Sequence, residues 1–204
     1  IGAAGSMPGE LHKLWKVLDQ NTYHMEYGYS CMGYEISAGI GVNLATPNRP
    51  NVVFSGDGSY LMMNSELATA AMMGISMTLI LTNNKGYGCI NRLQKATGGA
   101  EFNNLFSDSK FDKQIEIDFV SHAKSMGAKA VYVSEIAELE VVVKNTIRKK
   151  GVKVIVIDTD PNISTGEGGA WWDVAIPETF MDSNKSNLRK DYLVARINQN
   201  KGFK

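Results

Sequence analysis

One stretch of the sequence decides the fold, Asn51-Val52-Val53-Phe54-Ser55-Gly56-Asp57-Gly58-Ser59. It begins with a short apolar run bounded by turn residues, which is typical of a buried strand in a parallel sheet. Gly56 and Gly58 flank an acid where this strand ends, and they allow a sharp turn that brings N–H groups close to an anion. We therefore expect Asp57 at the carboxyl end of a strand, where open α/β sheets bind ligands.

A second polar segment, Asn83-Asn84-Lys85-Gly86, follows the next predicted strand. The pattern predicts a helix over residues 64–73, which Gly74 ends, and a strand over 77–81. The carboxyl ends of parallel neighbours lie at one edge of a sheet. One strand–helix–strand crossover is therefore expected to bring the Asp57 carboxylate and the Asn84 amide oxygen together.

These oxygens suit a magnesium ion, which takes six oxygen ligands in an octahedron and usually obtains several from phosphates and water. Asp57, Asn84 and one backbone carbonyl, that of Gly86, would supply three of them. The alternative is that Gly-Asp-Gly is a plain turn and Asn-Asn a plain loop. The joint spacing, with a strand before each element and a helix between them, favours the metal site.

Composition predicts one well-filled α/β domain, because the chain has 204 residues, 44% of them hydrophobic, and 20 glycines. The 21 basic and 21 acidic residues cancel, so neither nucleic acid nor an anionic membrane is an expected partner. No apolar run reaches the length of about 18 residues that a membrane span needs. Cys31 and Cys89 lie far apart, which favours a reduced, cytoplasmic protein without a disulfide.

The fold class that we predict is a three-layer α/β/α domain with a mainly parallel sheet. Residues 85–116 are rich in Gly and Asn and are expected to form a long loop. We expect the α/β domain to cover residues 1–160, and residues 161–204 to form an extension packed on it. The remaining expected helices cover residues 10–18, 33–45, 118–126, 136–150 and 187–198, and the remaining strands cover 23–27, 130–133 and 153–158.

This arrangement resembles the diphosphate-binding domain of thiamine diphosphate enzymes of the acetolactate synthase and pyruvate decarboxylase type. Further segments resemble one branch of that family more narrowly, the 3D-(3,5/4)-trihydroxycyclohexane-1,2-dione hydrolases of inositol catabolism. These segments are Tyr23-His24-Met25-Glu26-Tyr27-Gly28-Tyr29-Ser30-Cys31-Met32-Gly33-Tyr34-Glu35-Ile36, Gly88-Cys89-Ile90-Asn91-Arg92-Leu93-Gln94, Ala4-Gly5-Ser6-Met7-Pro8-Gly9-Glu10-Leu11 and Trp171-Trp172-Asp173-Val174.

The resemblance implies thiamine diphosphate and Mg²⁺ as cofactors, and it assigns roles to positions. Met32 would be the apolar wedge that holds the cofactor bent, and the backbone of Ser30 and Met32 would contact the aminopyrimidine. Gly58 and Ser59 would offer N–H groups to the diphosphate. The implied cofactor-binding residues are Ser30, Met32, Gly56, Gly58, Ser59, Asn84, Gly86, Tyr87 and Gly88, and the implied metal ligands are Asp57, Asn84 and Gly86.

No catalytic acid or base is assigned in this chain. His24 and Glu26 are candidates for substrate binding or proton transfer, and the alternative is a structural histidine beside a surface acid. Glu35 and Glu66 fall within predicted helices and are expected to be structural. In the family, the glutamate that activates the cofactor comes from a pyrimidine-binding domain of the partner subunit. The chain alone is therefore expected to be inactive, as a fragment or as the small subunit of a split enzyme.

The resemblance implies cleavage of the ring carbon–carbon bond of 3D-(3,5/4)-trihydroxycyclohexane-1,2-dione, giving 5-deoxyglucuronate, in an enzyme that is at least a homodimer. We expect the segment 87–111 to cover the polyol ring, and its deletion to spare metal binding. Two alternatives remain open. One is a 2-oxo acid decarboxylase or acetolactate synthase-like carboligase on the same scaffold, and the other is a non-catalytic module with the same fold.

Overall fold

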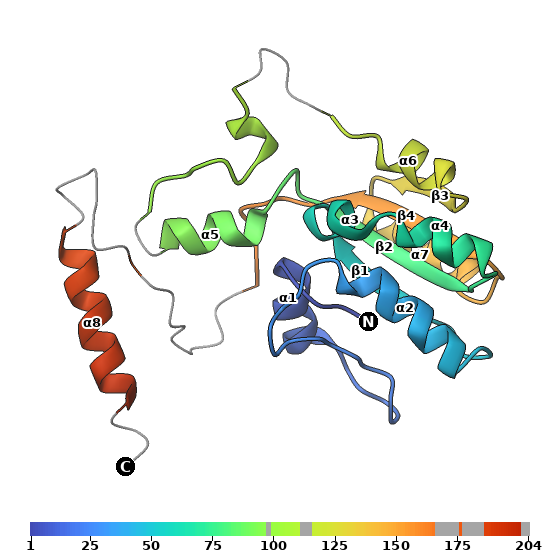
Figure 1. Ribbon diagram of the computed structural model, residues 1–204, viewed down its shortest axis with the longest axis horizontal. Helices are drawn as coiled ribbons and strands as arrows, with labels where there is room; N and C mark the ends of the chain where they lie inside the picture. The colour runs from blue at the N-terminus through green and yellow to red at the C-terminus, as the bar shows by residue number, and fades with distance from the viewer. Residues whose placement is uncertain (97–98, 111–115, 166–175, 177–185, 201–204) are drawn as a thin grey trace.

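Four parallel strands form the sheet of this computed structural model, which describes residues 1–96, 99–110, 116–165, 176 and 186–200 (Figure 1). The strands are β1 (Val52–Gly56), β2 (Met77–Asn83), β3 (Lys129–Val133) and β4 (Val152–Asp158), in the order β1-β2-β4-β3. Ile1 extends the sheet beyond β1, because its carbonyl accepts the Phe54 N–H at 2.8 Å. The predicted parallel sheet is confirmed.

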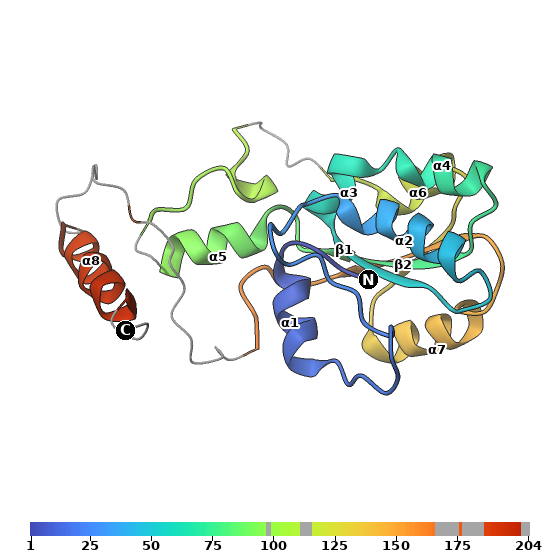
Figure 2. The same ribbon diagram turned by 60° about the horizontal axis from the view of Figure 1, so that its bottom comes forward.

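Helices cover both faces of this sheet, as Figure 2 shows. One face carries α2 (Tyr34–Ala45), α3 (Asp57–Met63), α4 (Glu66–Met72) and α6 (Phe119–Ser125), and the other carries α1 (Ser6–Leu14) and α7 (Ile136–Thr146). Both central strands, β2 and β4, are buried along almost their whole length, which explains their continuous apolar sequences. The predicted three-layer α/β/α arrangement is therefore confirmed.

Helix α2 packs directly on the sheet through a glycine. A Cβ atom added to Gly39 would lie 2.7 Å from Val53 Cγ2 and 3.0 Å from Met77 Sδ, so only a glycine allows this separation between helix and strands. Gly41, two residues further along the same helix, has no such neighbour within 4 Å. Gly39 is thus required for the close packing of α2 on the sheet, whereas Gly41 is not.

The crossover between β1 and β2 differs from its prediction. Instead of one helix over 64–73, it contains α3, which begins at Asp57 directly after β1, and α4. Gly56 keeps an extended conformation and Gly58 lies inside α3, so neither glycine makes the sharp turn that we expected. Asn64 separates the two helices and donates from its side chain to the Leu61 carbonyl at 3.0 Å. Such local hydrogen bonds compete with a continuous helix.

The expected long loop over 85–116 is also partly wrong, since it contains α5 (Gly88–Ala96) and the short 3-10 helix η1 (Phe106–Asp108). The apolar side chains Ile90 and Leu93 of α5 are exposed, so this helix has no buried apolar face that its sequence pattern could have predicted. Arg92 anchors it instead by donating to Ser6 Oγ at 2.6 Å and to the Pro161 carbonyl at 2.5 Å.

The remaining elements agree with their predictions apart from their ends. Helix α1 begins and ends four residues earlier than expected, with Pro8 in its first turn, and α7 ends at Thr146 rather than near residue 150. The strand expected over 23–27 is reduced to one bridge between Met25 and Gly2. No helix in the described ranges is long and apolar enough to cross a membrane.

The extension after residue 160 is described in part. Residues 161–165 contact the body, because the Thr165 N–H donates to Glu10 Oε1 at 3.2 Å. Helix α8 (Ser186–Asn200) confirms the expected terminal helix and stands on the side of α5 (Figure 1). Trp171-Trp172 lies outside the described residues. The division at residue 160 stays a prediction.

The two glycines of α2 give a matched test of the packing. Gly39→Ala should destabilise the chain by about 1–3 kcal/mol, since the new methyl group overpacks the contact with β1. Gly41→Ala should stabilise it by about 0.5–1 kcal/mol through helix propensity alone. Urea unfolding of both variants measures the difference. Equal stabilisation by the two substitutions would contradict the close packing of α2 on the sheet.

Candidate functional site

A buried carboxylate stands at the carboxyl end of β1. Asp57 is only 1% exposed, and its Oδ2 accepts the Gly86 N–H at 2.7 Å. Burial raises the pKa of this carboxyl, against the backbone hydrogen bonds that favour its charged form. The ion pairs among the described residues join other side chains, so no Lys, Arg or His there neutralises Asp57. A buried carboxylate in this state is suited to a cation.

Two further oxygen groups, of Asn84 and Gly86, converge with this carboxylate. With its amide oxygen pointing inward, Asn84 places Oδ1 2.7 Å from the Gly86 carbonyl oxygen and 3.2 Å from Asp57 Oδ1. With the amide turned over, its NH₂ group donates hydrogen bonds to both of these oxygens instead. Adjacent oxygens around an octahedral Mg²⁺ at about 2.1 Å lie about 3 Å apart. The inward orientation therefore has the oxygen spacing of half a magnesium site.

The register of the sheet produces this convergence. Gly56, the last residue of β1, pairs with Thr82 of β2, so Asp57 and Asn84 leave neighbouring strands at the same edge. Among the described residues there is no cluster of three or more His, Cys, Asp and Glu side chains that could hold a metal. A cation at this edge would therefore depend on the amide and backbone oxygens as much as on the carboxylate.

Two glycines give the Asn84 loop its shape. Gly86 has a φ of +141°, and a Cβ atom there would lie 2.4 Å from the Asn104 carbonyl oxygen. A Cβ atom on Gly88, the first residue of α5, would lie 2.9 Å from Asn84 Nδ2. Any larger residue at either position would displace the loop or the amide. The structure thus gives both predicted glycines a definite steric role beside Asn84.

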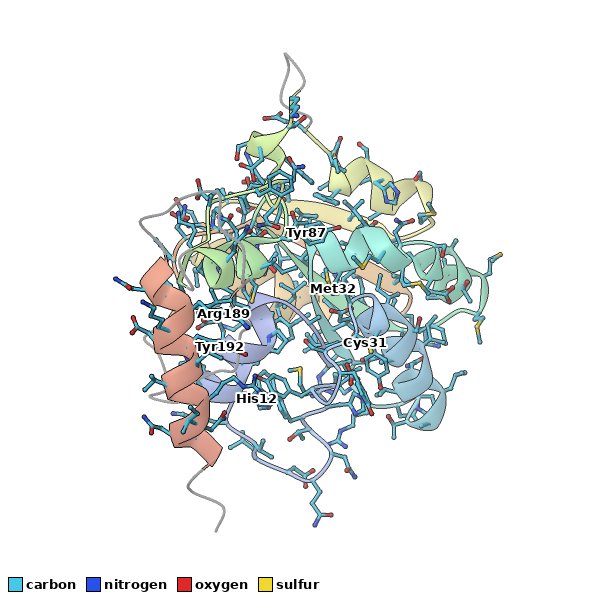
Figure 3. The ribbon with its side chains drawn as sticks, turned by 60° about the vertical axis from the view of Figure 1, so that its left-hand side comes forward. His12, Cys31, Met32, Tyr87, Arg189 and Tyr192 are labelled. Carbon is cyan, nitrogen blue, oxygen red and sulfur yellow. The ribbon has the colours of Figure 1, made fainter. Side chains whose placement is uncertain are left out.

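Met32 and Tyr87 both lie over Gly58 in the first turn of α3. A Cβ atom on Gly58 would lie 2.6 Å from Tyr87 Cε1 and 3.4 Å from Met32 Cε. Figure 3 shows Met32 and Tyr87 on the same side of the molecule, next to the exposed Cys31. The segments predicted to bind the cofactor, around residues 30, 58 and 87, are therefore neighbours in space.

The backbone on either side of Met32 is unusual. Ser30 has a φ of +54° and Gly33 a φ of +90°, so left-handed residues bracket the methionine on both sides. Such a conformation costs a non-glycine residue about 1 kcal/mol or more. Glu26 stabilises this bend, since its carboxylate accepts the Cys31 N–H at 2.6 Å and the Tyr29 N–H at 3.1 Å.

The two candidates for proton transfer, Glu26 and His24, have different hydrogen-bond partners. The hydrogen bond from the Cys31 backbone, followed by that from Tyr29, holds the pKa of Glu26 below its usual range. A carboxylate in this state favours a structural bond to the bend over proton exchange. His24 is exposed, and its Nε2 lies 2.7 Å from the Tyr34 hydroxyl while the two rings stack.

Glu35 has a larger part in the site than the sequence indicated. It is 1% exposed, its Oε2 accepts the Gly33 N–H at 3.0 Å, and its Oε1 accepts the Ala4 N–H at 3.4 Å. The Ser59 side chain also bonds this carboxyl, whose pKa burial raises. Glu35 therefore ties three separate segments of the site together. The available signal was an acid in the first turn of a helix made mostly of apolar and small residues.

Comparisons with known proteins agree with this geometry. Residues 3–157 match the family model described as thiamine pyrophosphate enzyme, C-terminal TPP binding domain. The chain is 39% identical over 193 residues to a 3D-(3,5/4)-trihydroxycyclohexane-1,2-dione hydrolase of Halalkalibacterium halodurans, and 42% identical over 198 residues to that of Clostridium tetani. Each match covers 94% of this chain but only 30% of the relative, so the chain spans about a third of their length.

Solved structures show the same fold at lower identity. A thiamine diphosphate-dependent 4-hydroxybenzoylformate decarboxylase of Rhodococcus jostii has a TM-score of 0.69 at 22% identity, covering 78% of this chain and 29% of its own. A benzoylformate decarboxylase of Polynucleobacter necessarius has a TM-score of 0.70 at 20% identity, covering 80% and 30%. On the family match and the hydrolase relatives together, this chain belongs to the thiamine pyrophosphate enzymes, through their C-terminal TPP-binding domain.

Proposed function

We propose that this chain is the diphosphate- and magnesium-binding domain of an enzyme that cleaves the ring carbon–carbon bond of 3D-(3,5/4)-trihydroxycyclohexane-1,2-dione to give 5-deoxyglucuronate. The observation that carries the cofactor part is the convergence of Asp57, Asn84 and Gly86 oxygens at the ends of β1 and β2. The substrate part is supported by the names of relatives that are 39–42% identical over 94% of the chain.

The metal part of the proposal uses all three oxygens. Asp57 Oδ1, Asn84 Oδ1 and the Gly86 carbonyl would hold Mg²⁺, and phosphate oxygens and water would complete its coordination. Asp57 Oδ2 keeps its bond to the Gly86 N–H, so one carboxylate would bind the metal and fix the loop at once. Gly58 and Ser59 lie in the first turn of α3, where N–H groups have no partner within the helix and would bind a diphosphate, although the Gly58 N–H also bonds the Asp57 carboxylate in this structure.

The organic part of the cofactor would lie between the Met32 bend and the beginning of α5. Ser30 and Met32 would contact the aminopyrimidine, with the Met32 side chain as the wedge beneath it. The site would be completed by two glycines, Gly56 and Gly88, which leave room for the diphosphate. The Tyr87 side chain would close over it. When bound, thiamine diphosphate supplies the electron sink for carbon–carbon cleavage. This chain's residues bind and orient it.

The activating carboxylate is proposed to come from elsewhere. Among the described residues, Asp57 is engaged with the Gly86 loop, and both Glu35 oxygens accept N–H groups of the chain. A pyrimidine-binding domain would bring the missing glutamate, in an enzyme that is at least a homodimer and cytoplasmic. The chain by itself would then be inactive. Glu26 would position the Met32 bend, and exposed His24 would face the substrate.

The segment 87–111, of which residues 97, 98 and 111 lie outside the described residues, is still proposed to cover the substrate, but its deletion would not spare metal binding. The Tyr87 N–H donates to the Asn104 carbonyl at 2.7 Å, and Gly86 forms a bridge with Leu105. Phe106 donates to the Lys85 carbonyl at 2.9 Å. Because these contacts hold the loop of Gly86, removing the segment would release a proposed metal ligand.

Substitution of the buried acid separates binding from folding. Asp57→Asn should stabilise the ligand-free protein by about 0.5–2 kcal/mol, because it removes an unpaired buried charge and its new NH₂ group can donate to the facing Asn84 Oδ1. Mg²⁺ with thiamine diphosphate should raise the melting temperature of the wild type by about 5–10 °C and that of the variant hardly at all. Differential scanning fluorimetry with and without both ligands measures this.

Asp158→Asn is the matched control, since Asp158 is an exposed acid at the same edge of the sheet, at the end of β4. This control should respond to the ligands as the wild type does. Asp57→Asn protein that still gained several degrees from Mg²⁺ and cofactor would refute the metal assignment.

The raised pKa of Asp57 also predicts a pH dependence. The folded chain keeps a proton on this carboxyl that the unfolded chain releases, so stability without metal should fall as pH rises from the ordinary Asp range to the raised folded pKa. Asp57→Asn should show a shallower fall, with the remainder due to Glu35, whose pKa burial also raises. Urea unfolding from about pH 4 to pH 8 measures both slopes. Identical slopes would contradict the buried charge.

Product analysis tests the reaction itself. The enzyme that contains this chain, loaded with Mg²⁺ and thiamine diphosphate, should convert the cyclic dione to 5-deoxyglucuronate and leave pyruvate unchanged. Release of CO₂ or formation of acetolactate from pyruvate would instead support the decarboxylase or carboligase alternative. Cofactor binding without turnover of either compound would support a non-catalytic module.

A further inference from the structure

A cavity of about 460 Å³ lies at the opposite end of the strands from Asp57. It is formed where β3 and β4 begin and where α7 ends, whereas the Asp57 site lies where β1 and β2 end (Figure 2). Five lysines line it, namely Lys124, Lys129, Lys149, Lys150 and Lys153. No Asp or Glu of the described residues contributes to its wall.

Two of these lysines are direct neighbours across the sheet. Lys129 of β3 pairs in register with Lys153 of β4, and like charges in this position repel each other. Lys153 is 4% exposed, its ammonium group donates to the Lys149 carbonyl, and burial together with Lys129 lowers its pKa. Burying one cation beside a second, with no carboxylate in the wall, costs free energy that an anion would recover.

The lysines of the cavity differ from Lys95 and Lys144 in having no ion pair among those described. Lys95 pairs with Glu101 at 2.7 Å and Lys144 with Glu140 at 3.4 Å, while the described ion pairs include none of the five cavity lysines. The overall charge is zero, with 21 basic and 21 acidic residues, so this is a local separation of charge and not a basic protein. Charge complementarity therefore indicates an anionic ligand.

The interior of the cavity is apolar. Val131, Val142 and Ile155 line it together with the lysines, and Thr146 has the one uncharged polar side chain in the described wall. A bare inorganic anion would leave this apolar surface in contact with water. A ligand with a carbon body would cover it and gain free energy from the apolar surface removed from water.

We propose that this cavity binds a small organic anion, with its carboxylate or phosphate group among the lysines and its carbon body on Val131, Val142 and Ile155. The site is separate from the proposed metal and cofactor residues, which lie at the other ends of the strands. The proposed anion binding does not depend on the proposed reaction, because it follows only from the charge and the lining of the cavity.

The test uses phenyl phosphate as the probe, with inorganic phosphate and phenol as its two halves. Isothermal titration of the purified protein should show phenyl phosphate binding at least about tenfold more tightly than either half, and weakening as salt is raised. Methyl NMR signals of Val131, Val142 and Ile155 should shift on binding. Equal affinity for inorganic phosphate would overturn the organic ligand, and equal affinity for phenol would overturn the role of charge.

Variants locate the binding. Lys129→Gln with Lys150→Gln changes two exposed lysines of the wall and should weaken phenyl phosphate binding by roughly tenfold or more. Lys144→Gln, an exposed lysine of α7 outside the cavity, should leave the affinity unchanged. If the double variant and the control bind alike, or if the three methyl groups do not respond in the wild type, the proposal is wrong.

Discussion

The crowding of three oxygens at one edge of the sheet is the constraint on which the rest of the site depends. The amide of Asn84 lies within hydrogen-bonding distance of both the Asp57 carboxylate and the Gly86 carbonyl, although a carboxylate and a carbonyl only accept. Either the Asn84 amide turns over to donate, or a cation binds between the oxygens. The Asn84 amide thus has two possible orientations, and the proposed metal would select the one with its oxygen inward.

The parallel sheet and a set of glycines build this crowding. Pairing of Gly56 with Thr82 sets the level at which β1 and β2 end, and Gly86 and Gly88 allow the following loop to fold back over Asp57. Glu35 then joins the Met32 bend to α3, because it accepts the Gly33 backbone N–H and a hydrogen bond from the Ser59 side chain. Three chain segments far apart in sequence are held by hydrogen bonds to two buried carboxylates.

Much of this was predictable from the sequence. Short apolar runs located the four strands of the sheet within one or two residues, although a fifth predicted strand, over 23–27, is only a bridge. The position of Asp57 and Asn84 after two such runs predicted their meeting. The split of the first crossover into α3 and α4 was not predictable, because it depends on a hydrogen bond from the Asn64 side chain to the Leu61 carbonyl. Helix α5 was missed because contacts with Ser6 and Pro161 hold it, while its apolar side chains are exposed. Glu35 was underrated because its partners come from Ala4 and Ser59, which no local pattern connects to it.

The most direct measurement is a crystal structure of the protein with thiamine diphosphate and Mn²⁺, which replaces Mg²⁺ and can be located by its anomalous scattering. The account predicts one strong peak about 2.1 Å from Asp57 Oδ1, Asn84 Oδ1 and the Gly86 carbonyl oxygen, with the Asn84 amide oxygen facing inward. A metal bound at any other residues, or an Asn84 NH₂ group that still points at Gly86 with the cofactor in place, would contradict it.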